Sequence, residues 1–567
     1  MLGRRTSKTR SLAIGPKLFL LLVALAASSA ACADRTPPTI YDVRVTASPR
    51  PDAPLGIPIE LSSDEPVRLS VELLSTTGSD VPSIQKLETI DFQPVFRTEH
   101  AFPLVGLRPA TSYEIRFIAT DKSGNSRQAP PLIIETSDLP SDFPPIEINT
   151  SDPTRMEPGA TLFSVYRWNA EGRDSTYGFL VAVNATGEPI WYYRADHPIS
   201  HAIPLRNGNL LYQTTVDSIS GLQVEIDLLG NVVNTWHSLA LDTRVPSESF
   251  LVSVDSLHHD VVELPNGNFA TLSTELRTYP DYPTSERERD APKTTQEVVG
   301  DIIVEFGRDG TVIQQWHLLD ILDPYRIGYD SLGTNYWATT YQALGKSEPN
   351  VTDWSHANAL DYDPNTDSFI ISARHQDAIV NIDRTGTLRW ILGNHSDWNE
   401  RWQDKLLDPI GELLWPYHSH GVELTPNGTI LLFDNGNYRT SPFEASDPTS
   451  ESYSRAVEFE VSGSAMTVVQ RWAHGKHSPA SFFSPFLGDA DWLPTTGNIL
   501  ITDGARTRRP ESDDTGEEQQ QWARILEVTR TVPAEVVFEL VIDDDTPHGW
   551  RVYRAGRWIA QPLLSNR

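Results

Sequence analysis

Four histidines stand at the same place in a repeated pattern, and imidazole is the side chain best suited to acid, base or nucleophilic chemistry near neutral pH. The segments read HAIPLRNGN, HDVVELPNGN, HANALDYDPN and HGVELTPNG, and they begin at His201, His259, His356 and His420. Each runs from the histidine into apolar residues and then into an Asn-containing turn. A histidine at one point of successive repeats predicts a ring of imidazoles around a common axis.

The register of this ring follows from the leucine near the end of each apolar run. The residues that stand four positions before such a leucine are His201, His356, His420 and, in a further repeat, Asp489. His259 stands five before Leu264, which predicts a bulge of one residue in that strand. The position is therefore specialised from repeat to repeat, as expected of a site and not of a purely structural mark.

Three further side chains have types that suit an anionic ligand. Asn358 lies two residues after His356, so in a strand both point to the same face. Arg374 ends the next predicted strand, in SFIISARH, and its planar guanidinium suits an oxyanion. Arg439, in FDNGNYR, is a looser candidate for substrate binding.

A histidine in such a repeat is more often a structural hydrogen-bonding residue than a catalytic one. His201 fits that structural interpretation best. His258 and His259 are adjacent in a strand and face opposite ways, so only one of them can line a channel. His418 and His420 face the same way, and the sequence leaves both open as the residue that lines the site.

The elements that must position these residues are short strands. A strand, a Gly turn and a strand that ends in an aromatic residue recur six times, and the aromatic residues are Trp191, Trp236, Trp316, Trp390, Trp472 and Phe538. Each hairpin precedes one of the histidine-type strands. Six such units predict a six-bladed β-propeller, an all-β fold, and RVYRAGRW near the C-terminus is predicted to supply its closing strand.

The domain order is predicted from composition and turn spacing. Residues 36–137 resemble a fibronectin type III β-sandwich through GLRPATSYEIRFIATDKSGNS, and 138–158 is a Pro- and Asp-rich linker. Residues 159–567 form the propeller. The insertion at 319–353 is long and aromatic, and it is predicted to fold over one mouth of the channel.

The N-terminus predicts export. Basic residues precede the apolar run from Leu18 to Ala27, and small residues lead to Cys32, so residues 1–32 resemble a signal peptide with a lipobox. Cys32 is the single cysteine, and no disulfide can form within the chain. We expect a periplasmic or cell-envelope protein with a lipid anchor at Cys32, a plain signal peptide being the alternative.

The charge excludes one class of partner. Lys+Arg 46 against Asp+Glu 76 gives a net charge of −30, which argues against nucleic acid. An anionic substrate would need strong local positive charge to bind. The sequence leaves the oligomeric state open, a homodimer included.

Several segments together resemble the bacterial aryl-sulfate sulfotransferases. They are MEPGATLF, HHDVVELPNGN, DWSHANALDYD, SFIISARHQDAIVNIDRTGTLRWILG and HGVELTPNGTILLFDNG, and they cover most of the chain after residue 150. The resemblance implies a six-bladed propeller with a smaller N-terminal β-sandwich. It also implies transfer of a sulfuryl group from a phenolic sulfate ester to a phenol, without a nucleotide donor, by a ping-pong mechanism through a sulfated histidine.

The resemblance also assigns roles to residues of this chain. It makes His420 the nucleophile, with His259, His356, Asn358 and Arg374 as its neighbours. Arg374 and the imidazoles would bind the sulfuryl oxygens, and His356 or His259 would exchange a proton with the phenol. The family pattern includes a disulfide near the active site, which this chain cannot form, and that departure bears on the substrate more than on the chemistry.

Two other functions compete with this hypothesis. The propeller could be a non-catalytic module that binds an anionic glycan or another protein, or a metal-dependent hydrolase or lyase. No spacing of His, Cys and acidic residues here demands a metal, and no cofactor is predicted. Arg374 with Asn358 on the channel side favours the transferase, because a scaffold needs neither.

Overall fold

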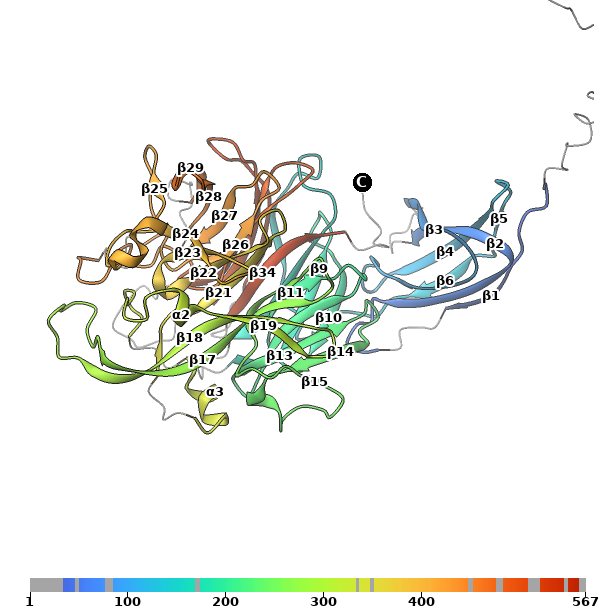
Figure 1. Cartoon of the computed structure of the whole chain (residues 1–567). Helices are drawn as coiled ribbons and strands as arrows, with labels where there is room; N and C mark the ends of the chain where they lie inside the picture. Colours follow the sequence, from blue (N-terminus) through green and yellow to red (C-terminus); the bar gives the residue numbers. More distant parts are fainter. Residues whose placement is uncertain are drawn as a thin grey trace, which may run out of the picture.

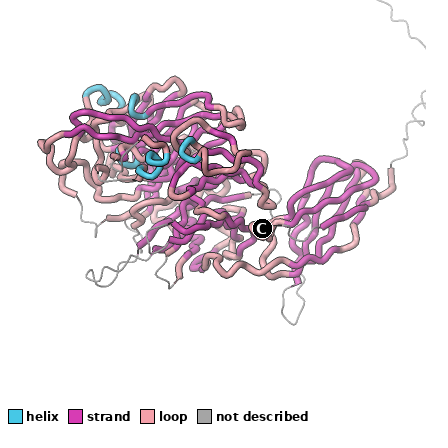
Figure 2. Tube along the Cα trace, turned by 90° about the horizontal axis from the view of Figure 1, so that it is seen from below, coloured by secondary structure: helices cyan, strands magenta, loops and turns pink. Residues whose placement is uncertain are grey.

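The structure, a computed structural model, describes most of the chain. It covers residues 34–45, 50–76, 85–168, 174–332, 336–346, 351–446, 452–475, 483–507, 521–544 and 549–559. The predicted signal segment and Cys32 lie outside these residues. The described chain is built almost entirely from strands (Figure 2). None of the helices in this part is long and apolar enough to span a bilayer.

The first strands form a separate unit, drawn in blue to cyan beside the larger body in Figure 1. Its strands are β1 (Ile40–Val45), β2 (Ile57–Thr76), β3 (Gln85–Leu104), β4 (Ser112–Asp121), β5 (Ser126–Gln128) and β6 (Leu132–Glu135). In β4 buried residues alternate with half-buried ones, as expected of a strand with one face on a core. That core includes Leu69, Phe117 and Tyr113, and the Tyr113 hydroxyl accepts a bond from the Arg108 amide.

The rest of the described chain forms six sheets of four or five strands, which are antiparallel apart from three two-residue strands that pair in parallel. The first holds β34 (Trp550–Trp558), β8 (Ala160–Trp168), β9 (Asp174–Val183) and β10 (Pro189–Ala195). The second holds β11 (Ile199–Pro204), β12 (Leu210–Val216), β13 (Ile219–Ile226), β14 (Val232–His237) and β15 (Phe250–Leu251). The third holds β16 (His258–Glu263), β17 (Phe269–Tyr282), β18 (Thr294–Phe306), β19 (Val312–His317) and β20 (Thr352–Asp353).

The remaining three sheets follow in chain order. The fourth holds β21 (Ala357–Asp363), β22 (Ser368–Ala373), β23 (Ala378–Asp383) and β24 (Leu388–Gly393). The fifth holds β26 (His420–Leu424), β27 (Ile430–Asp434), β28 (Arg455–Ser462), β29 (Thr467–His474) and β25 (Asp408–Pro409). The sixth holds β30 (Asp489–Trp492), β31 (Ile499–Thr507), β32 (Gln521–Val528), β33 (Val536–Ile542) and β7 (Glu147–Ser151).

The strand named first for each sheet above is its innermost strand, and we call it the first strand of that sheet. Each first strand contacts the first strand of the next sheet, and these contacts close a ring. The order around the ring is β34, β11, β16, β21, β26, β30 and back to β34. This is the arrangement of a propeller, and the all-β propeller-like fold expected from the sequence is confirmed. The C-terminal strand β34 completes the sheet begun by β8, as RVYRAGRW predicts.

The segment predicted as a linker differs from expectation. It carries β7, which pairs with β33 at the outer edge of the sixth sheet. In β7 exposed and half-buried residues alternate, so its period of two suits an edge strand better than a linker. The chain therefore joins the sixth sheet before it forms the first.

Four of the six junctions between neighbouring sheets share one arrangement, which we call the clasp. A glutamate on the third strand of one sheet is almost fully buried and pairs with an arginine of the next sheet. The pairs are Glu225 with Arg308, Glu305 with Arg384, Glu458 with Arg530 and Glu527 with Arg557. Each glutamate also accepts bonds from the first turn of its own sheet, such as those from Asn266 and Asn268 to Glu305.

The junction between the fourth and fifth sheets lacks the clasp. Asn381 takes the place of the glutamate, and Val461 stands where the arginine would be, three residues after Glu458. A cavity of about 690 Å³ opens there, lined by both residues and by Trp390. The junction between the first and second sheets is apolar instead, with Ala182 and Leu228 in one core cluster.

The helices are short and lie in the connections. They are η1 (Leu239–Leu241), α2 (Leu318–Ile321), α3 (Ala338–Ala343), η2 (Arg374–Gln376) and η3 (Glu400–Lys405). The 319–353 insertion is tied to the fourth sheet through Arg326, which donates to the carbonyl and side-chain oxygens of Gln376 at 2.7 and 3.0 Å. In return Gln376 donates to the Trp354 carbonyl at 2.8 Å.

The N-terminal unit packs on the first two sheets. Ala53 and Val105 belong to the core cluster that contains Leu228. The Arg194 amide donates to the Asp52 carbonyl at 2.8 Å. No described residue of this unit lines the cavity that holds the histidines.

Candidate active site

A cavity of about 340 Å³ collects side chains from all around the ring of first strands. Its lining comprises Tyr166, Pro198, Ser200, Thr215, His259, Tyr336, Asp353, His356, Arg374, His375, His420, Phe486, Leu487, Arg551 and Tyr553. Four of the predicted site residues, His259, His356, Arg374 and His420, are therefore brought together. A polar patch within otherwise aromatic walls is the usual form of a small-molecule site.

The backbone is bent where the histidines enter the cavity. His259 and His356 have φ of +57° and +42°, a left-handed conformation that is rare for residues other than glycine. Such conformations cost about 1–3 kcal/mol each and cluster at functional sites. For His259 the bend accounts for the register offset of one residue seen in the sequence. His356 lies just before β21 and not within the strand.

His420 begins β26 and is 3% exposed. The next residue, Gly421, has φ of +58°, and a Cβ there would overlap Asp489 of the sixth sheet. Glycine thus lets the two first strands approach closely beside His420. Burial first and the nearby Arg374 second lower the pKa of His420 well below its ordinary value, so its imidazole is neutral at pH 7.

The protonated nitrogen of His420 can be assigned from its neighbour. Nδ1 of His420 lies 2.7 Å from Oδ1 of Asn435. The Asn435 amide nitrogen donates to the Ser484 and Leu487 carbonyl oxygens at 2.7 and 2.8 Å, which fixes how the amide is turned. Since Oδ1 can only accept, Nδ1 of His420 carries the proton and Nε2 has the free lone pair.

His356 is held by a carboxylate. Its Nδ1 lies 2.5 Å from Oδ2 of Asp353, and Oδ1 of Asp353 accepts from the Trp337 indole at 3.0 Å. Burial and then Arg374 lower the pKa of His356 to about 3, while burial raises the pKa of Asp353. The pair is therefore a neutral imidazole donating to a carboxylate, as in the histidine–aspartate pairs of hydrolases, with Nε2 free to take a proton.

His259 belongs to a third chain of contacts. Its Nδ1 lies 2.7 Å from Nδ1 of His258, so one of these two atoms donates to the other. Nε2 of His258 lies 3.2 Å from Oδ1 of Asp301, and Asp301 also accepts from the Ser355 hydroxyl and the Ala357 amide. Burial first, and then the neighbouring His356, which disfavours a second proton nearby, lowers the pKa of His259 well below its ordinary value.

Arg374 supplies the fixed positive charge beside the three histidines. It follows the last residue of β22 and begins η2, where its side chain reaches the Pro485 carbonyl at 3.3 Å. Burial lowers the pKa of its guanidinium and Asp353 counteracts this, yet a guanidinium stays protonated at neutral pH. The cavity is therefore positively charged, despite the acidity of the whole chain.

Aromatic rings form the rest of the wall. Tyr336, from the insertion, has its ring centroid 4.9 Å from that of His356. Tyr553, from β34, lies 6.3 Å from His259, and burial raises its pKa well above the ordinary value, so it stays an uncharged phenol. The insertion thus lines the cavity through Tyr336 and Asp353, in line with its predicted place at the mouth.

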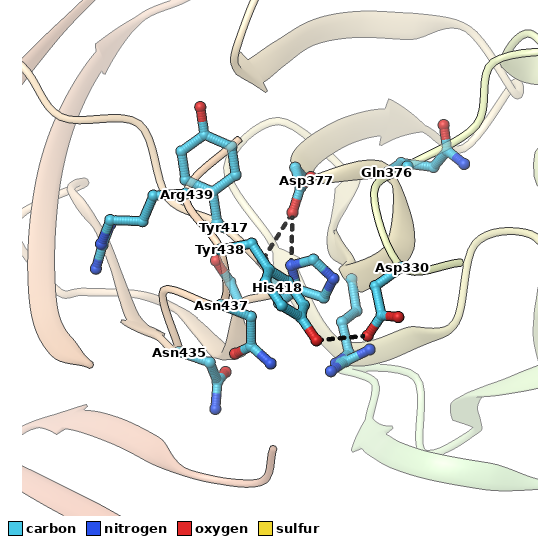
Figure 3. A network of polar contacts seen from close by, with 12 residues as sticks. Asp330, Gln376, Asp377, Tyr417, His418, Asn435, Asn437, Tyr438 and Arg439 are labelled. Atoms are coloured by element: carbon cyan, nitrogen blue, oxygen red, sulfur yellow. Dashed lines mark hydrogen bonds and ion pairs between the residues drawn. The ribbon is translucent and has the colours of Figure 1, made fainter. Parts of the chain in front are cut away.

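Two predicted residues lie elsewhere. Asn358 is fully buried and donates to the Ser419 carbonyl at 2.8 Å, so it joins β21 to the fifth sheet and does not line the cavity. Arg439, predicted to bind substrate, bonds Asp434 at 3.0 Å and the Tyr453 carbonyl at 2.8 Å. Its guanidinium is held over the Tyr453 ring, and Figure 3 shows it directed away from His418.

His418 and His201 are also outside the cavity lining. His418 rests against Asp377, with its backbone amide 2.8 Å and its Nδ1 3.3 Å from Oδ1 of that residue (Figure 3). His201 lies within β11, with Nε2 3.3 Å from Asp260, which is paired with Arg554. Of His418 and His420, only His420 faces the cavity, and His201 fits its predicted structural role.

Sequence reasoning missed two cavity residues, Asp353 and His375, and the partner of His420, Asn435, although all three stand inside the motifs it used. Asp353 precedes His356 by three positions in DWSHAN, and His375 follows Arg374 in SARHQ. Asn435, in FDNGNYR, was passed over in favour of Arg439. These residue types were visible in the sequence. Which of them contacts the histidines depends on the bent backbone and on the pairing of neighbouring strands, and only the structure shows both.

One group of side chains has the composition of a metal site. Atoms of Asp353, His356 and His375 lie within 4.8 Å of one another. Asp353 is already used in this group, since its side chain accepts from His356 and its carbonyl oxygen accepts from Nδ1 of His375 at 2.7 Å. With both Nδ1 atoms serving as donors, the group is better described as a hydrogen-bonded support for His356.

Comparison with known proteins shows the family of this chain. The family model described as arylsulfotransferase (ASST) matches residues 147–554. The chain belongs to the arylsulfotransferase family. The family resemblance predicted from the motifs is thereby confirmed, and the matched range contains all six sheets except the last residues of β34.

Two curated relatives carry the same printed name, arylsulfate sulfotransferase AssT. The protein of Lelliottia amnigena is 29% identical over 315 residues, which is 50% of this chain and 48% of the relative. That of Escherichia coli O6:H1 is 29% identical over 261 residues, which is 40% of this chain and 42% of the relative. The chain thus matches about half the length of each relative.

Proposed function

We propose that this protein is an arylsulfate sulfotransferase, which moves a sulfuryl group from a phenolic sulfate ester to a phenol. Family membership and the names of the two relatives support the activity. The observation that carries it is the tautomer of His420. A neutral imidazole with a free Nε2 lone pair, in a positive cavity with aromatic walls, is equipped to attack an aryl sulfate.

In the first half-reaction, Nε2 of His420 attacks the sulfur of the donor ester. The new N–S bond forms as the S–O bond to the ring breaks, and the electron pair of that bond leaves with the phenolate oxygen. Arg374 stabilises the negative sulfuryl oxygens, a role worth about 10²- to 10³-fold in comparable sites. The product of this step is a sulfated histidine, so the reaction is ping-pong.

In the second half-reaction, a phenol replaces the phenolate and its oxygen attacks the same sulfur. Nε2 of His356 takes the phenol proton, which leaves an imidazolium beside the Asp353 carboxylate. The N–S electrons return to His420, and the imidazolium of His356 gives its proton to the next departing phenolate. Atoms and charge therefore balance over one cycle without an added cofactor.

The first test is transfer from p-nitrophenyl sulfate to phenol by the wild type and by His420→Ala. We expect His420→Ala to lose at least about 10⁴-fold in rate, because it removes the atom that carries the covalent step. The matched control is His317→Ala, which changes a half-buried histidine on β19 outside the cavity lining. Denaturing mass spectrometry of enzyme quenched with donor alone should locate an acid-labile sulfate at His420.

The competing functions give different results in the same assay. Release of nitrophenolate that phenol does not accelerate indicates hydrolysis, and saturable binding with no turnover indicates a recognition module. Activity that is lost with a chelator and restored by a metal ion would favour a metal-dependent enzyme at the Asp353 group. Full transfer activity in His420→Ala would refute the nucleophile assignment.

We also propose that the protein is exported and anchored by a lipid at Cys32. The support is the basic stretch, the apolar run Leu18–Ala27 and the small residues before Cys32. Expression of the full chain should yield a membrane-associated form that Cys32→Ser releases into the soluble fraction. Unchanged membrane association in Cys32→Ser would refute the anchor.

A further inference from the structure

Two histidines of the cavity have their Nδ1 atoms held by acceptors of different chemistry. The acceptor at His356 is a carboxylate, Asp353, whereas at His420 it is the amide oxygen of Asn435. Both imidazoles are neutral and both present Nε2 as the free atom. The difference between the acceptors therefore matters only once something is bound to Nε2.

The amide at His420 is locked in place. Both protons on the Asn435 nitrogen are used by the carbonyl oxygens of Ser484 and Leu487, at 2.7 and 2.8 Å. Asn435 itself is fully buried, and its own carbonyl accepts from the Ser454 hydroxyl. An amide held in this way accepts one hydrogen bond from His420, and it cannot accept the proton itself at any pH at which the protein folds.

This restriction determines the form of a sulfated His420. When Nε2 bonds to sulfur, the ring becomes cationic unless Nδ1 gives up its proton. A carboxylate in place of Asn435 would accept that proton and leave a neutral N-sulfoimidazole, which can release the sulfuryl group only by departing as an imidazolate. With the amide the proton stays, and the ring departs as neutral imidazole, a far better leaving group.

We propose that Asn435 is a positioning residue that keeps the sulfated His420 in its reactive, Nδ1-protonated form. This inference rests on the proposed function. In the transfer step the acceptor oxygen forms its bond to sulfur and the N–S bond breaks. The electron pair returns to Nε2, and Nδ1–H is unchanged throughout, so no proton has to be supplied to His420 in either half-reaction.

The carboxylate at His356 supports the same division of roles. A residue that must accept and return a proton gains from a carboxylate that holds its other nitrogen, and Asp353 occupies that place at His356. A residue that must accept and return a sulfuryl group gains from a partner that leaves its proton alone. The two acceptors are therefore matched to two different transferred groups.

The test compares Asn435→Asp with the wild type, with p-nitrophenyl sulfate and phenol both saturating, as the pH is raised. The new carboxyl would be buried against two carbonyl oxygens, which raises its pKa. While protonated, it can donate to one carbonyl and still accept from His420, as the amide does. Once ionised, it takes the Nδ1 proton of the sulfated ring.

We expect the ratio of sulfated to unsulfated enzyme in Asn435→Asp to rise relative to the wild type by up to about tenfold for each pH unit across that ionisation. Quenched-flow mass spectrometry measures this ratio. Asn435→Ala, which leaves the tautomer of His420 free, should slow both half-reactions without accumulation. In the wild type, ¹⁵N spectra of labelled histidine should place the His420 proton on Nδ1.

The matched control is Asn437→Asp. Asn437 lies two residues away and also donates to a carbonyl of the same segment, Pro485, at 3.0 Å, but it is not the hydrogen-bond partner of His420. The Asn437→Asp variant should have the same steady-state fraction of sulfated enzyme as the wild type. Equal sulfated fractions in Asn435→Asp and Asn437→Asp at every pH would overturn the inference, as would a His420 proton on Nε2.

The same measurements separate this inference from the function on which it rests. Absence of a sulfated histidine in the wild type overturns the proposed function, and the inference with it. If His420 is sulfated in the wild type but the fraction of sulfated enzyme in Asn435→Asp equals that of the wild type at every pH, the inference alone is overturned.

Discussion

Each sheet has a cavity end, where its first strand begins beside the histidines, and a turn end, where that strand runs into its first turn. The two ends differ in how far their residues repeat from sheet to sheet. At the turn end, the clasp recurs at four junctions, each with a buried third-strand glutamate, an arginine of the next sheet and a polar partner from the first turn. At the cavity end, the histidines at the entrances of the first strands have different partners: His258 for His259, Asp353 for His356 and Asn435 for His420. Repetition at one end holds the ring together, and variation at the other end builds one asymmetric site.

The two ends also treat charge differently. In the clasp of Glu305, burial alone would raise the pKa of the glutamate, but bonds from Asn268, Asn266 and Arg384 outweigh it and lower that pKa. The cavity histidines are uncharged because burial is not compensated, and their pKa values fall. The clasps therefore stabilise the fold, whereas burial of the neutral, reactive histidines in the cavity lowers the stability of the fold.

The largest expected effect belongs to the cavity end. His356→Asn keeps a donor to Asp353 but removes the Nε2 base, so transfer to phenol should fall by about 10²- to 10⁴-fold. Formation of the sulfated enzyme from p-nitrophenyl sulfate should fall much less, since nitrophenolate needs little protonation. Single-turnover kinetics measure the two steps separately, and the melting temperature should stay within a few degrees of the wild type.

The pH profile of the wild type is the check on this assignment. kcat/KM reports the pKa values of the free enzyme, and burial puts that of His356 at about 3. Activity should therefore persist at pH 5, where an ordinary imidazole of pKa about 6.5 would be about 30-fold depleted in its neutral form. A decline of that size between pH 7 and pH 5 would show that the catalytic base is not His356.

A broken clasp should have the reverse effect. Arg384→Met leaves the buried Glu305 without its cation, and removing one partner of such a pair costs about 3 kcal/mol. The melting temperature should fall by several degrees while kcat/KM at 25 °C stays within about twofold. The pair joins the third and fourth sheets at their turn end, and neither of its residues lines the cavity that holds the histidines.

The control for the clasp is an ion pair exposed to solvent. Arg471 and Glu460 lie in the fifth sheet with side chains 45% and 52% exposed. Arg471→Met should leave the melting temperature almost unchanged, because exposed pairs contribute little. If Arg384→Met lowers activity as strongly as His356→Asn does, the separation between the two ends is wrong.

The difference between the ends also decides what could be predicted from the sequence. The strand pattern and the tryptophan-marked hairpins predict the sheets, and the recurrent histidines predict His259, His356 and His420, because repetition is visible along the chain. Arg374 follows from its place at the end of a strand. Asn435 and Asp353 do not, because their roles depend on which nitrogen of a histidine they face, and this is set by local backbone bends.

Asn358 and Arg439 are the two residues that the sequence predicts for the site and that the structure places elsewhere. Alternation along an ideal strand places Asn358 on the face of His356, but the left-handed backbone at His356 breaks that alternation just before β21 begins. Arg439 has the right chemistry for an anion, yet Asp434 and the Tyr453 carbonyl already bind its guanidinium. Residue type alone cannot reveal such competition from partners that are distant in sequence.

The smallest expected effect concerns the junction that has no clasp. In the clasps of Arg308, Arg384 and Arg530, the arginine stands three residues after the third-strand position of its own sheet; in the fifth sheet that place is Val461, facing Asn381 across a cavity. Asn381→Glu alone buries an unpaired charge and loses bonds to Ser368 and Phe369, and Val461→Arg alone has no carboxylate to meet. Each single change should therefore lower the melting temperature.

Combined, the two changes should restore part of what each one costs. If the clasp is a unit that any junction can hold, the double variant should show a favourable coupling of about 1–3 kcal/mol, measured as a double-mutant cycle on thermal unfolding. The hairpin of the fifth sheet is longer than the others, so the gain should fall short of a native clasp. Activity should not change in any of the three variants, since neither position lines the histidine cavity, and a coupling near zero would mean that the clasp depends on the length of its turn as much as on its two charges.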